Sequence, residues 1–121
     1  MVESMRILLA EDERTISRLI NQVLTNAGHE VVAVQSVLDA LEQFKARQFD
    51  LVLLDLHLAD GDGMRLLSSL DELGYPIPPV VLMTGEGSFE EGDPRASRVA
   101  TVLSKPFGLD DLERTVNNFV A

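Results

Sequence analysis

The chain contains no cysteine and few basic residues, with 10 Lys and Arg against 20 Asp and Glu. Without cysteine it can form no disulfide, no thiolate nucleophile and no cysteine-based zinc site. Its formal net charge of −10 at pH 7 repels phosphate backbones, which argues against direct nucleic-acid binding. The acidity has two open interpretations: it serves solubility, or part of it is gathered in a cation-binding site.

Long apolar runs are also missing. No stretch approaches the roughly 18 residues that a membrane span needs, and the start, Met1-Val2-Glu3-Ser4, is acidic and unlike a secretory signal. We therefore expect no membrane span and a cytoplasmic location. The length of 121 residues fits one domain, and no repeat, low-complexity tract or linker divides it. We expect residues 1–121 to form a single domain without a second one.

Short apolar runs alternate with amphipathic stretches along the chain. Runs typical of buried strands occupy 6–10, 30–34, 51–54, 80–83 and 99–103. Helical periodicity covers 15–27, 64–73, 109–120 and a stretch that begins after the capping residue Ser36. The helix signal over 86–97 is weak because Gly87, Gly92 and Pro94 interrupt it. Alternating strands and helices with continuously apolar strands predict an α/β fold, a doubly wound five-stranded parallel sheet with helices on both faces.

Residues with chemical functions follow four of the five predicted strands. The first strand is followed by Glu11 and Asp12, the third by Asp55, the fourth by Thr84 and the fifth by Lys105. Taken singly, each has an ordinary explanation as a helix cap, a turn hydroxyl or an exposed lysine. Folds of this class bind ligands at the carboxyl ends of the strands, near a topological switch point. The joint occurrence therefore predicts that these side chains converge on one site.

The chemistry of this set is coherent. Three carboxylates in one cleft raise one another's proton affinity, and a hard dication such as Mg²⁺, which prefers oxygen ligands, relieves the repulsion. The Thr84 hydroxyl and the Lys105 ammonium suit a phosphoryl group. A carboxylate nucleophile that attacks phosphorus forms an acyl phosphate. The residues alone thus indicate phosphoryl transfer at a magnesium site.

This ordered set resembles the receiver domain of two-component response regulators, a family with a (βα)5 flavodoxin-like fold. The resemblance extends over nearly the whole chain. Its elements are Glu11-Asp12, Asp55 after Leu-Val-Leu-Leu, Asp62-Gly63, Thr84-Gly85 and Lys105-Pro106-Phe107. Single elements are common by chance, whereas the ordered set on five strands is specific.

The resemblance implies that Asp55 accepts a phosphoryl group from a histidine kinase or a phosphotransfer protein, and that the phosphorylated state changes binding to a downstream protein. Thr84 and Lys105 would contact the phosphoryl group. The Lys105–Pro106 bond is expected to be cis, with Lys105 directed inward. Such a domain catalyses its own phosphorylation and dephosphorylation and is not a turnover enzyme. The resemblance implies no output domain within these residues.

The resemblance also implies the ligands of the Mg²⁺ ion. Asp12 and Asp55 would bind it directly, together with the backbone carbonyl of His57, and Glu11 would bind it through water. The His57 side chain is expected to be exposed, because Mg²⁺ prefers oxygen. His29 is expected at the surface.

The sequence departs from the family pattern at three places. Ala59 stands where the family usually has proline, and Val102 stands where it often has an aromatic residue. The third departure is the weak fourth helix. Because valine has no ring to turn inward, we predict switching by ordering of residues 85–98.

Two other functions remain open at this stage. A phosphorylation-independent interaction module of the same fold usually loses acidic residues or the lysine, and all are present here. A phosphatase of the haloacid dehalogenase type needs a second Asp two residues after its nucleophile, where this chain has His57. A calcium loop around Asp60 and Asp62 is discounted because no Glu stands at the twelfth position.

Overall fold

The computed structural model describes residues 3–85 and 97–120, and its middle layer is a five-stranded sheet. The strand order is β2-β1-β3-β6-β7, and every neighbouring pair is parallel. The strands are β1 (Arg6–Ala10), β2 (Glu30–Val34), β3 (Leu51–Asp55), β6 (Val80–Thr84) and β7 (Thr101–Ser104). The predicted fold class is confirmed, with the switch point between β1 and β3.

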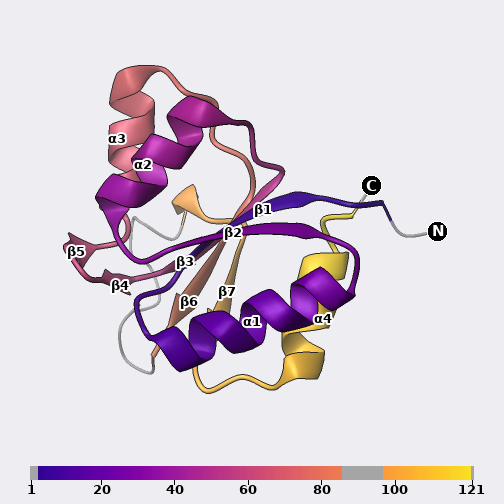
Figure 1. The fold of residues 1–121 in the computed structure, drawn as a ribbon. Coiled ribbons are helices and arrows are strands. Elements are labelled where there is room, and N and C mark those ends of the chain that lie inside the picture. Colours follow the sequence, from indigo (N-terminus) through magenta and orange to yellow (C-terminus); the bar gives the residue numbers. More distant parts are fainter. Residues whose placement is uncertain (1–2, 86–96, 121) are drawn as a thin grey trace.

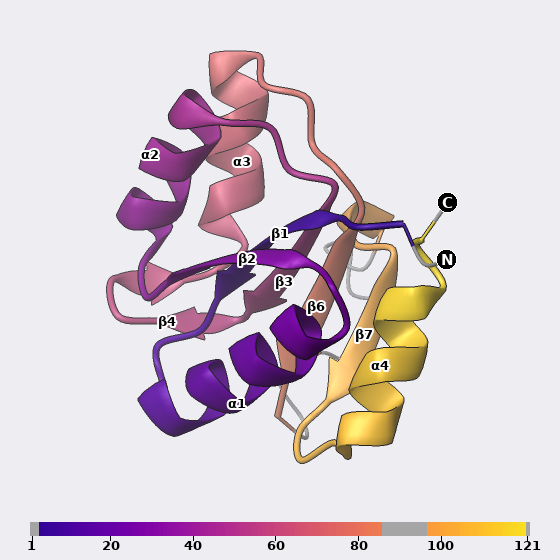
Figure 2. The ribbon, with the colours of Figure 1, turned by 45° about the vertical axis from the view of Figure 1, so that its right-hand side comes forward.

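Helices cover both faces of this sheet. On one face lie α1 (Arg14–Asn26) and α4 (Leu109–Asn117), and on the other lie α2 (Val37–Ala46) and α3 (Arg65–Leu73) (Figures 1 and 2). None of the helices in the described ranges is long and apolar enough to cross a membrane.

The three central strands, β1, β3 and β6, contribute side chains to two separate cores. In β1, Ile7 and Leu9 pack in the core beside α1 and α4, whereas Leu8 and Ala10 pack in the core beside α2 and α3. Successive side chains of a strand point to opposite faces, and here both faces are buried. This double burial explains why the central strands have unbroken apolar sequences.

Local capping signals are confirmed at the helix ends. The Ser36 hydroxyl accepts a hydrogen bond from the Asp39 N–H (3.0 Å) at the start of α2. Gly74 follows α3 with φ +79°, a left-handed conformation that costs glycine little because it has no Cβ. These residues fix where the helices begin and end.

Several predicted boundaries need correction, and β3 and β6 each include one more residue than predicted, Asp55 and Thr84. The first helix begins at Arg14, and Glu13, rather than Glu11 or Asp12, caps it by accepting from the Thr15 N–H (3.1 Å). The last strand begins at Thr101 instead of residue 99, because pairing with β6 starts at Val81 and Thr101.

The last helix ends at Asn117 instead of residue 120. Phe119 and Val120 continue the apolar pattern and pack against the core, but their N–H groups bond to carbonyls three residues back, Val116 and Asn117. Such bonds tighten the chain beyond a helix end. The apolar pattern therefore extends beyond the end of the helix, which is why the sequence predicted a longer one.

The loop after β3 contains a short hairpin that the sequence did not predict. It consists of β4 (His57–Leu58) and β5 (Gly61–Asp62), which pair antiparallel. The weak helix expected over 86–97, and with it most of the segment 85–98 expected to switch, lies outside the described residues.

His29 was expected at the surface, and this expectation is wrong. The residue is only 4% exposed, and its Nδ1 accepts a hydrogen bond from the Met5 N–H (3.0 Å). Within the described part of the chain its Nε2 has no hydrogen-bond partner. The turn after α1 is covered because the start of β1 passes beside it, where the Glu30 N–H also bonds to the Met5 carbonyl (2.9 Å).

Candidate functional site

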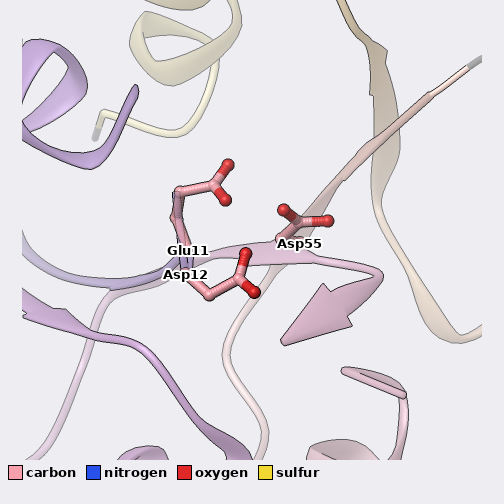
Figure 3. Close-up of side chains that lie close together, drawn as sticks. All are labelled: Glu11, Asp12 and Asp55. Carbon is pink, nitrogen blue, oxygen red and sulfur yellow. The ribbon is translucent and has the colours of Figure 1, made fainter. Parts of the chain in front are cut away.

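The register of the central strands brings the acidic residues together. Ala10 in β1 lies opposite Leu54 in β3, so the residues that follow them, Glu11 and Asp55, are at the same level. The carboxylates of Glu11, Asp12 and Asp55 face a common space (Figure 3), and their oxygens lie within 4.8 Å of one another. The predicted convergence of the three acids is confirmed.

Lys105 joins this group from the edge strand of the sheet. Its N–H donates to the Thr84 carbonyl (2.7 Å), which continues the pairing of β6 and β7. Its Nζ donates to Asp55 Oδ2 (2.8 Å) and to Glu11 Oε1 (2.5 Å). The Lys105–Pro106 peptide bond is cis, as predicted. One ammonium group therefore bridges two carboxylates at the centre of the site.

Glu11 is the most strongly perturbed acid of the site. Its side chain is fully buried, and burial, together with the neighbouring Asp55, raises its pKa to about 7. The Lys105 ammonium and the Glu13 N–H, which donates to Glu11 Oε2 (3.1 Å), oppose the rise. The sequence predicted a mutual increase in proton affinity among the carboxylates, but the main cause at Glu11 is burial, because loss of hydration disfavours the anion.

Asp55 behaves in the opposite way. Burial acts to raise its pKa, but hydrogen bonds with Glu11, with the Lys105 ammonium and with the His57 N–H (2.9 Å) outweigh burial and lower it. The pKa of Lys105 is raised: burial acts to lower it, and its bonds to Asp55 and Glu11 outweigh that effect. Within the cluster, Asp55 therefore stays ionised, and Glu11 is the acid that binds a proton more readily.

The remaining predicted residues surround this group at different depths. Asp12 is exposed, and so is the His57 side chain, as predicted for the histidine. Thr84 is only 4% exposed, and its hydroxyl donates to the Gly85 carbonyl (3.3 Å). Its main chain is held beside Lys105, whereas its side chain is engaged within the turn that follows β6.

Gly63 packs directly against the backbone of Asp55. A Cβ at this position would lie 2.1 Å from the Asp55 carbonyl oxygen and 3.2 Å from a methyl carbon of Leu54. The Gly63 N–H donates to the Leu56 carbonyl (2.7 Å), which closes the loop over the end of β3. In the sequence Gly63 stood out only as part of the resemblance, and the structure supplies the physical reason for glycine.

Sequence reasoning missed the contact made by Asp60. Its two carboxylate oxygens accept hydrogen bonds from the N–H groups of Val37 and Leu38, at 2.8 and 3.1 Å. These bonds lower the pKa of Asp60. No local pattern could have predicted them, because a helix cap is normally sought in the residues just before the helix.

The acidic cluster can hold a metal ion. All of its side-chain donors are carboxylate oxygens, which suit hard dications. Three carboxylates lie within 4.8 Å of one another, and a bound cation would relieve their repulsion. Lys105 supplies only one positive charge to the two carboxylates that it bridges.

Comparison with known proteins identifies the family. Residues 7–117 match the response regulator receiver domain. The response regulator receiver protein CpdR of Brucella abortus is 33% identical over 116 residues, which cover 95% of this chain and 96% of that protein. The swarming motility regulation protein RssB of Serratia marcescens is 33% identical over 108 residues, 89% of this chain and 49% of that protein.

Longer regulators share only this part of their length with the chain. The transcriptional regulatory protein ZraR of Escherichia coli O157:H7 is 31% identical over 120 residues, 98% of this chain but 27% of that protein. The chain thus spans about a quarter of ZraR and about half of RssB.

Solved structures agree with this assignment. The structure of NtrX from Brucella abortus superposes with a TM-score of 0.85 at 29% identity, over 96% of this chain and 26% of that one. A CheY-like receiver domain from Methylobacillus flagellatus gives a TM-score of 0.85 at 24% identity, over 97% and 99% of the two chains, and supports the fold alone. The matched residues, the relatives and the fold lead to one conclusion: this chain belongs to the receiver domain family of two-component response regulators.

Proposed function

We propose that Asp55 accepts a phosphoryl group from the phosphohistidine of a histidine kinase or a phosphotransfer protein, in a Mg²⁺-dependent reaction. One observation carries the proposal. Lys105 Nζ lies 2.8 Å from Asp55 Oδ2 and 2.5 Å from Glu11 Oε1, so a buried nucleophile, a second acid and a cation meet at the carboxyl edge of the sheet. This combination suits a reaction that transfers a highly charged group.

The residues present fit a magnesium ion. We assign Asp12 and Asp55 as direct ligands, together with the His57 carbonyl. Glu11, whose oxygens accept from Lys105 Nζ and the Glu13 N–H, would act through water. When bound, Mg²⁺ would neutralise negative charge on the phosphoryl oxygens. Few protein ligands suit this ion, since it keeps several waters and binds substrate phosphate.

The chemistry of the proposed step follows from the state of Asp55. Its lowered pKa keeps the side chain ionised, as a nucleophile requires. A carboxylate oxygen of Asp55 bonds to phosphorus while the phosphorus–nitrogen bond of phosphohistidine breaks, and the imidazole leaves with the electron pair. Thr84 and Lys105 would hold the phosphoryl oxygens through a hydroxyl and an ammonium group. The product is an acyl phosphate.

The reverse change restores the carboxylate. Water attacks phosphorus, the bond to the Asp55 oxygen breaks, and inorganic phosphate leaves. The domain would thus catalyse its own phosphorylation and dephosphorylation, without turnover of a separate substrate. The phosphorylated form would change affinity for a downstream protein. With a net charge of −10, this partner is expected to be a protein and not a nucleic acid.

We extend the proposal to the setting of the domain. Residues 1–121 are assigned to one receiver domain that acts in the cytoplasm, where histidine kinases present their phosphohistidine. The kinase or phosphotransfer protein would approach the carboxyl edge of the sheet, because Asp12 lies exposed there.

The test is mass spectrometry after incubation with acetyl phosphate and Mg²⁺. We expect a gain of one phosphoryl group that requires Mg²⁺ and disappears in Asp55→Asn, which keeps the shape of the side chain. Phosphate on another residue of the wild type would contradict the assignment. In a parallel titration, Asp12→Ala should weaken Mg²⁺ binding more than Glu11→Gln, and equal affinities would refute the separate roles.

A further inference from the structure

The loop after Asp55 is tied to the first turn of α2. Asp60 Oδ1 accepts from the Val37 N–H (2.8 Å), and Oδ2 accepts from the Leu38 N–H (3.1 Å). The first N–H groups of a helix have no partner within the helix, and a carboxylate there also faces the positive end of the helix dipole. Asp60 therefore caps α2 from a position 23 residues further along the chain.

Two more bonds hold the same turn. The Ala59 N–H donates to the Gln35 carbonyl (3.1 Å), just before α2, and Arg65 Nη1 donates to the Asp60 carbonyl (3.3 Å) from the start of α3. A proline at position 59 would have no N–H to donate. The loop is thus anchored by hydrogen bonds on both sides, one of which depends on a residue other than proline at position 59.

This anchored turn is directly connected to Asp55. The turn joins the two strands of the short hairpin, in which His57 pairs with Asp62 and Leu58 with Gly61. The His57 N–H donates to Asp55 Oδ1 (2.9 Å). A displacement of Asp60 would therefore reach the Asp55 carboxylate through a hairpin arm of only two residues.

We propose that Asp60 is a positioning residue: by capping α2 it fixes the hairpin, and through the His57 backbone it holds the Asp55 carboxylate and the cation-binding carbonyl in place. The inference rests on the proposed function, which assigns the cation to Asp12, Asp55 and the His57 carbonyl. Asp60 itself touches neither the cation nor the reacting atoms. Its effect is on the geometry of groups that do.

The chain offers a matched control for this proposal. Ser36 caps the same helix turn by accepting from the Asp39 N–H (3.0 Å), and within the described residues its hydroxyl makes no hydrogen bond to the loop after Asp55. Ser36→Ala and Asp60→Ala thus each remove a cap from α2. Only Asp60→Ala also releases the loop.

The experiment measures phosphorylation by acetyl phosphate as a function of Mg²⁺ concentration in wild type, Asp60→Ala, Asp60→Asn and Ser36→Ala. We expect Asp60→Ala to raise the Mg²⁺ concentration for half-maximal rate about tenfold, the lower end of the effect of losing a residue that supports a metal ligand. Ser36→Ala should change this Mg²⁺ concentration less than about twofold. Both variants should lower the melting temperature by a few degrees, because each removes a helix cap. Asp60→Asn keeps one acceptor oxygen, so its Mg²⁺ concentration for half-maximal rate should lie between those of wild type and Asp60→Ala.

A second readout needs no metal and no phosphate. Hydrogen exchange of the His57 amide should become faster in Asp60→Ala and stay unchanged in Ser36→Ala. Equal exchange and equal Mg²⁺ dependence in the two variants would overturn the proposal and leave Asp60 as a helix cap alone. If wild type neither binds Mg²⁺ nor takes up phosphate, the proposed function fails, and the exchange comparison still decides whether Asp60 fixes the loop. Should Asp60→Ala not fold, Asp60→Asn carries the same comparisons.

Discussion

Ion pairs lie at both ends of the sheet, and among those of the described residues the one at the carboxyl end is buried. At the amino end, Arg6 Nε donates to Glu30 Oε2 (2.6 Å) with side chains that are 40% and 51% exposed. At the carboxyl end, Lys105 bridges a Glu11 side chain with no exposure and an Asp55 side chain with 8%. Water screens the first pair and is excluded from the second. Similar distances therefore have different consequences: a surface ion pair at one end and a strongly perturbed acid at the other.

The largest effect should come from removing the cation of the buried group. In the metal-free protein, Lys105→Ala leaves Glu11 and Asp55 facing each other, and breaking a buried pair in this way costs about 3 kcal/mol of unfolding free energy. Loss of the ammonium also raises the pKa of Glu11 further above its ordinary value, because Lys105 normally lowers it. A group whose folded pKa is raised loses its stabilising contribution as pH rises through that pKa. The loss should therefore be larger at pH 8 than at pH 6.

Urea unfolding at these two pH values measures this difference. Arg6→Ala, which removes the cation at the exposed end, is the matched control and should show little dependence on pH. A Lys105→Ala loss below about 1 kcal/mol, or one that is equal at both pH values, would mean that the two ends behave alike.

The next largest effect should come from crowding the backbone of the site. In Gly63→Ala the new methyl carbon would lie only 2.1 Å from the Asp55 carbonyl oxygen, so the loop must shift. Overpacking of this kind costs about 2 kcal/mol, and the phosphorylation rate with acetyl phosphate should fall as well. Gly108→Ala is a suitable control because its Cβ would meet nothing closer than 3.6 Å. Equal unfolding free energies in the two variants would show that the loop yields without cost.

A smaller effect, limited to a pH window, concerns the buried histidine near the amino end. Burial lowers the pKa of His29 below its ordinary value of 6.5. The neutral form therefore contributes stability that is complete above the unfolded pKa and is lost as pH falls through the lower folded pKa. His29→Asn keeps an acceptor for the Met5 N–H but cannot titrate, so it should reduce the loss of unfolding free energy on acidification. Chemical unfolding from pH 7.5 down to 5 tests this, and an unchanged pH slope would argue against it.

Glu11→Gln supplies the opposite control for that measurement. The raised pKa of Glu11, about 7 against an ordinary 4.5, makes its contribution largest at low pH and lost as pH rises through about 7. Replacing it should remove a loss of unfolding free energy that grows as pH rises from about 4.5 to about 7, a change opposite in sign to the one expected for His29→Asn.

The smallest effect is expected for the exposed pair. A double-mutant cycle with Arg6→Ala and Glu30→Ala should give a coupling free energy of about 0.5 kcal/mol, which decreases as salt is added. The cycle is needed because Arg6 Nη1 also donates to the Gln48 carbonyl (3.3 Å). A coupling above about 2 kcal/mol would indicate that the amino end is shielded from water far more than its exposure suggests.

The sequence by itself predicted the five strands of the main sheet, the four described helices and the grouping of the acidic residues with Lys105. The first two predicted strands match β1 and β2 in their bounds, because an apolar run with a polar end is a local signal that a doubly covered sheet requires. The rule that parallel strands present their carboxyl ends at one edge was enough to group Glu11, Asp12, Asp55 and Lys105. The chemical roles of these residues, and of Thr84 and His57, stay predictions.

Only the tertiary structure decided how deeply each group is buried and which distant atoms it meets. Glu11 and Asp12 are adjacent acids in the sequence, yet one is fully buried and the other exposed. His29 is covered by the start of β1, and Asp60 caps a helix from a later loop. Burial, pKa shifts and hydrogen bonds of this kind depend on segments that are far apart in the chain, so local patterns of residues could not predict them.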